Sequence, residues 1–345
     1  MFDIVWLNTR LLLFYNNNNI TERSGSLSGI VAIEIPTPFL VGPVNVYLIK
    51  GDVLTLVDVG PKTEEGLASL TEQLHKAGYK LSDIEQIVLT HHHPDHVGLL
   101  DVFSNSVNIV GHHKTKPWLK KDECFISGVR DFFKVFYERN GVPASVIKEI
   151  LQSNENYLDL SPHIEIDETI SEGDEIKGLP GWKVIDTPGH AQSHISLYHE
   201  QANIMIAGDH LLAKISSNAL LEAPYKAGEE RPKTMLQYRD SLRKVQELSI
   251  NRVYSGHGPV IENCYELIGM RLKEQEKRAT YIKSLMSQSS LSCFELVQKM
   301  FPTIYCKQPA LTFSEVYGHL ELLIQQEEVK VEESAMGQFI FSPLN

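Results

Sequence analysis

The sequence predicts an α/β protein in which two β-sheets are packed between layers of helices, with a mostly helical segment towards the C-terminal end. Two strand-rich halves carry β-branched runs bounded by glycine and proline. Apolar residues at helical spacing separate many of these runs. Because both halves combine strands with helices, two sheets sandwiched by helices are the arrangement that best buries the apolar faces.

The first strand-rich half begins at Ile30. Its β-branched runs predict strands at 30–35, 44–49, 53–57 and 87–90. A helix is expected over 62–78, because its apolar residues recur at helical spacing. Residues 1–29, which include a four-asparagine run and a Ser/Gly-rich patch, are expected to form a flexible leader.

Residues 114–160 are expected to form a helical insertion. Val129, Phe132, Phe133, Phe136 and Tyr137 recur at helical spacing. Core packing is the simplest role for this aromatic stripe. We hypothesise that the insertion also covers the active-site cleft and forms an apolar wall of that cleft. The second strand-rich half then predicts strands at 164–166, 182–186, 195–199, 204–207 and 252–255, with a helix over 234–248.

From residue 263 onward the sequence predicts a separate domain, which leaves 30–262 as the catalytic domain. A long helix over 266–286 precedes two capping-box signatures, Ser292-x-x-Glu295 and Thr312-x-x-Glu315. A hairpin is expected around residues 330–341, and helices followed by a hairpin are typical of a winged helix. Residues 266–345 carry eight Lys or Arg against ten Asp or Glu. We therefore expect this domain to pack against the catalytic domain or to form a homodimer.

The overall charge and the cysteines narrow the class of protein. The 345 residues include 32 basic and 44 acidic side chains, a net charge of −12. This balance argues against a broad nucleic-acid-binding surface, although a local basic patch is compatible with it. The four cysteines lack CxxC spacing, and the sequence predicts neither a membrane span nor a signal peptide. These features predict a cytoplasmic protein with no membrane partner.

One short segment concentrates residues that bind metals. His91, His93, Asp95 and His96 follow the apolar strand at 87–90. Alternate residues leaving a strand point the same way, so His91 and His93 can converge on one ion. After Pro94 the chain turns and presents Asp95 and His96 from another direction, which predicts two half-filled sites.

Three further ligand candidates follow later strands, each next to a glycine that lets a loop approach a metal closely. They are His190 in Pro188-Gly189-His190, Asp209 in Gly208-Asp209 and His257 in Gly256-His257-Gly258. Near these candidates stand the spare histidines His92, His194 and His210. Most spare histidines orient ligands or support structure. Among these three, His194 is the best candidate to touch the substrate or a ligand carboxylate.

These motifs resemble the metallo-β-lactamase superfamily in register over residues 30–262, beginning with Leu56-Val57-Asp58-Val59-Gly60. The resemblance implies an αββα sandwich with the active site along one edge. It implies that His91, His93 and His190 hold a first metal. It also implies that Asp95, His96 and His257 hold a second, that Asp209 bridges both, and that Asp58 orients a ligand.

Details of the motifs separate the branches of this superfamily. By this resemblance, exported β-lactamases of the superfamily carry a cysteine at the position that Asp209 holds in this chain. Flavodiiron proteins carry a glutamate at the position that His93 holds. The ligand set here resembles the branch that includes glyoxalase II, lactonases and nucleases. His210-Leu211-Leu212-Ala213 lacks the tyrosine that lactonases often carry after the bridging aspartate. Two further segments depart from the usual motifs of the superfamily without removing a ligand, namely Val97-Gly98-Leu99 and Ala191-Gln192-Ser193-His194.

These observations predict a binuclear metal-dependent hydrolase acting on a small-molecule thioester, ester or lactone. Its cofactor is expected to be two Zn²⁺, with Mn²⁺ or Fe²⁺ as alternatives, because imidazole and carboxylate serve all three. We predict Asp95, Asp209 and His194 as catalytic residues. Two alternatives stay open. One is a single-strand endoribonuclease, a group of the superfamily that the C-terminal segment also resembles. The other is a mononuclear iron enzyme resembling a persulfide dioxygenase.

Overall fold

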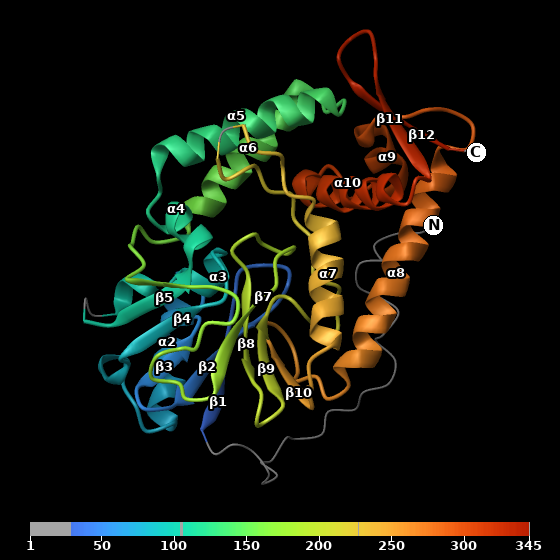
Figure 1. The fold of residues 1–345 in the computed structure, drawn as a ribbon. Helices are drawn as coiled ribbons and strands as arrows, with labels where there is room; N and C mark the ends of the chain where they lie inside the picture. Colours follow the sequence, from blue (N-terminus) through green and yellow to red (C-terminus); the bar gives the residue numbers. More distant parts are fainter. Residues whose placement is uncertain (1–28, 104–105, 227, 345) are drawn as a thin grey trace.

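The computed structural model describes residues 29–103, 106–226 and 228–344. All but the last residue of the expected leader, 1–29, therefore lies outside the described residues. Within the described part, two sheets lie face to face with helices on their outer sides (Figure 1). This confirms the predicted α/β class. None of the helices found in these ranges is long and apolar enough to cross a membrane.

The first sheet holds six strands in chain order, β1 to β6. Their bounds are Ile30–Ile35, Val44–Lys50, Leu54–Val57, Gln86–Leu89, Asn108–His112 and Glu168–Ile170. β1 to β3 pair antiparallel, and β3 to β6 pair parallel. Helix α2 (Glu64–Lys76) covers the outer face, because Leu70 and Leu74 are buried against the sheet. Short 3₁₀ turns occupy Leu81–Asp83, Leu100–Val102 and His113–Thr115.

The last strand of this sheet lies later in the chain than the sequence predicts. A strand was expected at 164–166, but β6 is formed by Glu168–Ile170. Ile166 is still buried in the core under this sheet. The backbone before β6 pairs irregularly instead, with Ile164 donating to Leu119 and Asp167 to Ile109. Apolar alternation marks an extended, buried segment here, but ladder pairing begins only after it.

The second sheet contains four strands in the order β10-β9-β8-β7. These strands are β7 (Trp182–Asp186), β8 (Ile195–His199), β9 (Ile204–Gly208) and β10 (Arg252–Ser255). β9 and β10 run parallel, so their carboxyl ends lie at the same edge. Val57 and Val88 of the first sheet and Val184 and Leu197 of the second share one buried core. Helix α7 (Thr234–Gln246) covers the outer face of this sheet.

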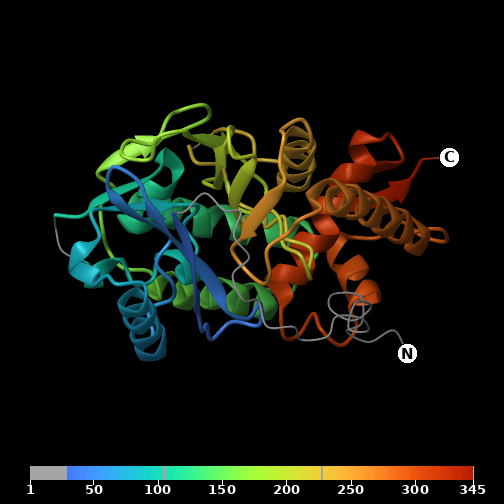
Figure 2. The same cartoon turned by 90° about the horizontal axis from the view of Figure 1, so that it is seen from below.

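Most helices of the insertion and the C-terminal segment pack together beyond one end of the sheets (Figures 1 and 2). The long helix that opens the C-terminal segment instead runs alongside α7. The insertion forms α4 (Lys116–Leu119), α5 (Glu123–Arg139) and α6 (Ala144–Asp159). The C-terminal segment forms α8 (Cys264–Leu285), α9 (Cys293–Met300), α10 (Pro309–Gln325), β11 (Val329–Glu333) and β12 (Phe339–Pro343). Helix α10 contacts α6, α7, α8 and α9. Phe133 and Tyr137 of α5 share its core with Phe313. The aromatic stripe therefore has the packing role expected of it.

Of the two expected capping boxes, one is present. Ser292 caps α9, accepting a hydrogen bond from the backbone of Glu295, and the Glu295 carboxylate accepts one from the backbone of Ser292. The second prediction was wrong, because α10 begins at Pro309 and Thr312 lies inside it. The Thr312 hydroxyl donates back to the Gln308 carbonyl, and Glu315 pairs with Arg278 of α8. Proline at the first helical position starts this helix one turn earlier.

Replacing Ser292 with alanine should lower the stability of the protein by about 1 kcal/mol, because α9 loses its N-terminal cap. The change can be measured as a shift in the midpoint of urea unfolding. Ser290→Ala, at an exposed position two residues earlier, is the matched control and should leave the midpoint unchanged. Equal shifts in the two variants would contradict the assigned cap.

Candidate metal centre

The histidine-rich segment leaves the first sheet at the carboxyl end of β4. Thr90 follows the strand, and His91 and His93 project from the extended backbone after it. A short helix, α3 (Pro94–Val97), starts with proline and carries Asp95 and His96 in its single turn. Proline suits this position because its missing N–H would be unpaired there in any case. The predicted change of direction at Pro94 is therefore confirmed.

The second sheet brings the remaining candidates to the same place. His190 lies in the turn between β7 and β8, Asp209 directly follows β9, and His257 lies two residues after β10. Gly208 has a positive φ of 48°, a left-handed conformation that favours glycine. Gly256 lies so close to Asp209 that a Cβ atom there would overlap the carboxylate. Glycines therefore let two strand ends approach each other beside the site.

Three histidines form the first group. His91 Nε2 and His93 Nδ1 are 2.9 Å apart, and His93 Nδ1 and His190 Nε2 are 3.0 Å apart. All three residues are at least nine-tenths buried. Their ligand atoms lie close enough together to hold one metal ion.

Asp95, His96 and His257 form the second group. His257 Nε2 lies 3.3 Å from Asp95 Oδ2, and His96 Nε2 lies 3.9 Å from the same oxygen. These three residues are also buried, and their ligand atoms lie within 4.8 Å of one another. The two groups use side chains from α3, from the loops that follow β4 and β10, and from the β7–β8 turn, so only the folded chain assembles them.

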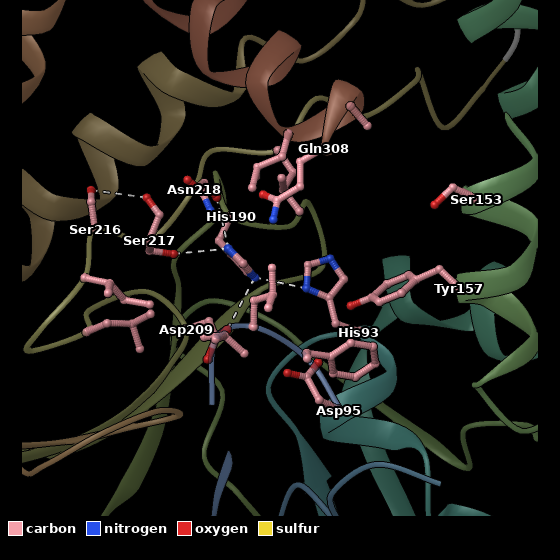
Figure 3. Close-up of a pocket in the computed structure, with 18 of the residues that line it drawn as sticks. His93, Asp95, Ser153, Tyr157, His190, Asp209, Ser216, Ser217, Asn218 and Gln308 are labelled. Carbon is pink, nitrogen blue, oxygen red and sulfur yellow. Dashed lines mark hydrogen bonds and ion pairs between the residues drawn. The ribbon is translucent and has the colours of Figure 1, made fainter. Parts of the chain in front are cut away.

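Asp209 contacts histidines of both groups, and Figure 3 shows it beside His190. Its Oδ1 is 3.4 Å from His96 Nε2, and its Oδ2 is 3.5 Å from His257 Nε2. Oδ2 is also 3.6 Å from His190 Nε2, in the first group. A single carboxylate therefore faces both groups, which is the geometry of a bridging ligand.

The donor set fits divalent cations. Tetrahedral zinc, with bonds of about 2.0–2.1 Å, separates its ligand atoms by roughly 3.4 Å. Four of the separations between a carboxylate oxygen and an imidazole nitrogen are 3.3–3.6 Å, close to that value. The imidazole nitrogens of the first group are closer, at 2.9–3.0 Å. His96 Nε2, His257 Nε2 and Asp209 Oδ1 are buried without a hydrogen-bond partner in the described structure. Unpaired buried polar atoms are costly, and ions at the centre of the two groups would satisfy them.

Hydrogen bonds fix the outer nitrogen of most of these histidines. His190 Nδ1 lies 3.0 Å from the Asn218 carbonyl, and His257 Nδ1 lies 2.7 Å from the Pro43 carbonyl. His91 Nδ1 is 3.0 Å from Thr90 Oγ1. Such contacts orient a ring so that its other nitrogen faces the metal.

Asp58 completes this outer shell of contacts. Its carboxylate lies 2.8 Å from His96 Nδ1 and also accepts from the Thr90 backbone and hydroxyl. Its φ is +62°, an uncommon value for a residue other than glycine. The contact with His96 matches the orienting role that the resemblance implies for Asp58.

The two groups of candidate ligands differ in the protonation of their histidines. Burial and the neighbouring histidines hold the pKa values of His91 and His93 well below the usual value, so both rings are neutral. Burial alone would also lower the pKa of His257, but the Asp209 carboxylate raises it to about 10. His257 and His96 in turn hold the pKa of Asp209 well below its usual range, although burial opposes this. A cation entering the second group therefore displaces protons, which favours metal binding at higher pH.

The spare histidines do not face the centre. His194 Nε2 accepts a hydrogen bond from the Asp209 backbone, and its Nδ1 lies 2.8 Å from Thr187 Oγ1. Both of its nitrogens are engaged within the protein, which differs from the substrate or carboxylate contact expected for a catalytic His194. His92 stacks on Trp118, with ring centroids 4.6 Å apart. His210 is fully buried beside Tyr238.

A cavity of about 410 Å³ opens onto the two groups and is lined by His93, Asp95, His190 and Asp209. Tyr157, at the end of α6, points its hydroxyl into this cavity beside His93 (Figure 3). Gln308 and Lys307, which precede α10, line the opposite wall. Sequence reasoning missed these residues because the contacts join segments far apart in the chain. The only sequence signal was an aromatic residue at the end of the insertion.

A family model for the metallo-beta-lactamase superfamily matches residues 40–257 of the chain. This match covers more than half of the sequence and includes all seven converging side chains. The chain therefore belongs to the metallo-beta-lactamase superfamily.

Individual relatives agree with this assignment. The chain is 43% identical to the probable metallo-hydrolase YqjP of Bacillus subtilis, over 87% of this chain and 93% of that protein. It is 24% identical to an atrochrysone carboxyl ACP thioesterase of Aspergillus fumigatus, over 68% of this chain and 56% of the relative. The crystal structure of a metallo-beta-lactamase family protein from Thermus thermophilus superposes with a TM-score of 0.77 at 24% identity, covering 92% of this chain and 99% of that one.

Gly256→Ala should lower metal content and turnover by at least about tenfold, because the new Cβ overlaps the Asp209 carboxylate between the two groups. Metal can be counted by elemental analysis of the purified protein. Gly269→Ala, in α8 with open space around it, is the control and should retain full metal content. Wild-type metal content in Gly256→Ala would contradict the assigned position of Asp209.

A buried carboxyl group near His190 makes stability depend on pH. Glu222 accepts hydrogen bonds from the Gln192 backbone and the Tyr225 hydroxyl, and burial raises its pKa from 4.5 to about 7. Between these two pH values the folded chain holds a proton that the unfolded chain releases. This contribution to stability is therefore present at low pH and is lost as the pH rises towards about 7.

Glu222→Gln should remove that loss, because an amide stays uncharged at every pH. We expect the melting temperature of the variant to rise, relative to wild type, between pH 5 and pH 8. Differential scanning calorimetry at both pH values measures this difference. The exposed Glu230→Gln is the control, and the same pH-dependent gain in that variant would argue against burial as the cause.

Proposed function

We propose that this chain, a hydrolase of the metallo-beta-lactamase superfamily, cleaves a small-molecule thioester, ester or lactone with two divalent cations. The observation that carries the proposal is the position of Asp209 beside two groups of three buried candidate ligands each. A site built for a single ion has no need of the second group. The geometry therefore favours a two-ion hydrolase over the mononuclear iron alternative.

His91, His93 and His190 would hold the first cation and Asp95, His96 and His257 the second, with Asp209 touching both. Two such cations supply hydroxide from water near neutral pH and polarise the oxygen of the scissile group. Zinc suits this mixture of imidazole and carboxylate ligands, and manganese or iron can use the same ligands.

The side chains of the site then have separate tasks. The carboxylates of Asp95 and Asp209, which face the cavity, can accept the proton that the attacking water gives up. His194 holds the Asp209 backbone, so it positions that carboxylate rather than touching the substrate. Tyr157 places a phenol hydroxyl beside His93, where it can donate a hydrogen bond to a carbonyl oxygen.

The cavity lining supports a small, uncharged substrate over RNA. Among the described residues that line it, Lys307 is the one lysine or arginine, while Phe39, Leu40, Val41 and Leu212 are apolar. RNA binding normally relies on several cations along the phosphate backbone. The name of the Aspergillus relative, a thioesterase, supports the same choice of reaction.

The proposal can be tested with metal-loaded protein and a panel of thioester, ester, lactone, phosphodiester and RNA substrates. We expect turnover of at least one acyl substrate. We also expect a loss of at least about 100-fold in Asp209→Ala, because both cations lose a shared ligand. The exposed His113→Ala is the control and should be as active as wild type. Cleavage of RNA with no acyl substrate turned over would refute the proposed substrate class.

A further inference from the structure

A second cavity, also of about 410 Å³, lies between the helical insertion and the body of the protein. Its walls come from α5, α6, the loop at residues 220–223 and the first turn of α10. It reaches the histidine-rich segment at His92, His93 and Pro94. Small-molecule sites commonly enclose about 300–1,000 Å³, so this volume is sufficient for a ligand group.

The two cavities adjoin each other. Both are lined by His93, Ser153, Tyr157, Leu220, Ala310 and Leu311. Tyr157 stands at the boundary, with its ring edge-to-face against Phe39 at 5.5 Å. A single elongated molecule can therefore extend from the metal centre, past Tyr157, into the second cavity.

The second cavity is lined mainly by apolar side chains, among them Val129 and Phe133 of α5, Leu158 of α6 and Leu221. Arg130 is the one lysine or arginine among the described residues that line it, and its guanidinium lies 2.7 Å from the Glu155 carboxylate at a half-exposed position. The buried Glu222 carboxyl group is held by Gln192 and Tyr225. Within this described lining, no unpaired cation is thus available for a phosphate or nucleotide.

We infer that the second cavity binds the apolar acyl group of the substrate while the bond to be cleaved lies beside His93 and Asp209. The inference rests on the proposed function and narrows its substrate to an acyl thioester or ester with a medium-length apolar chain. Hydrolysis adds the oxygen of water to the acyl carbon and breaks the bond to sulfur or oxygen. The thiol or alcohol leaves with one proton, and the chain stays in the cavity as the carboxylic acid.

The position and the charge of the second cavity both favour an apolar acyl group as its occupant. The cavity adjoins the candidate metal centre at His93, so a group attached to the reacting carbonyl can reach it. Each methylene moved from water into such a lining adds about 0.8 kcal/mol, which corresponds to about fourfold in affinity. Octanoyl substrates should therefore bind and react markedly better than acetyl substrates.

Direct binding tests the cavity without any turnover. Octanamide and acetamide, uncharged mimics of the two acyl groups, can be titrated into metal-loaded protein by calorimetry. We expect octanamide to bind at least tenfold more tightly than acetamide. Val129→Trp and Leu158→Trp, which fill the cavity from two different helices, should each weaken octanamide binding at least tenfold. Val135→Trp, on the solvent side of α5 and 54% exposed, is the matched control and should bind as wild type does.

Octanamide binding no tighter than acetamide binding, or an equal loss of affinity in Val135→Trp, would overturn the inference.

Turnover measurements distinguish a failure of this inference from a failure of the proposed function. Wild-type protein should hydrolyse S-octanoyl-N-acetylcysteamine at least tenfold more efficiently than the S-acetyl compound. Val129→Trp should lose that preference for the octanoyl compound. Rapid hydrolysis without chain-length preference would refute the cavity's role alone. Octanamide binding without hydrolysis of any acyl substrate would refute the proposed function alone.

Discussion

The Asp209 carboxylate allows six other candidate metal ligands to share one buried volume. It lies within 3.6 Å of histidines from both groups, and its charge favours the protonated forms of His96 and His257. Burying several ionisable groups without compensation is costly, because charges are poorly solvated inside a protein. The remaining contacts of the site keep this one carboxylate in place.

Two sets of contacts hold Asp209 in place, one between strand ends and one from the His194 side chain. The β9 and β10 strands run parallel, so Gly208 and Gly256 emerge at the same edge and can pass closely beside each other. His194 then accepts a hydrogen bond from the Asp209 backbone and is itself held by Thr187. These are local constraints of sheet topology and small residues. They explain why the site lies where the strands end.

The helical additions build the space around that site. Helix α10 starts at Pro309 rather than at Thr312, which brings Ala310 and Leu311 to the wall of both cavities. The end of α6 supplies Tyr157 from the opposite side. The two-sheet sandwich provides the converging ligand atoms, while the insertion and the C-terminal helices supply residues that line both cavities.

The sequence by itself determined the α/β class, most strand positions and the seven converging side chains, because strand periodicity and ligand chemistry are written in short, local patterns. It misplaced the strand before residue 168, where hydrogen bonding to distant segments overrides the local pattern. It also misplaced the start of α10, which Pro309 sets one turn before Thr312. Only the tertiary structure decided that His194 faces the Asp209 backbone and that Tyr157 enters the site. These contacts join residues far apart in the chain or on different sides of a turn. Side-chain direction there depends on packing, which no local pattern encodes.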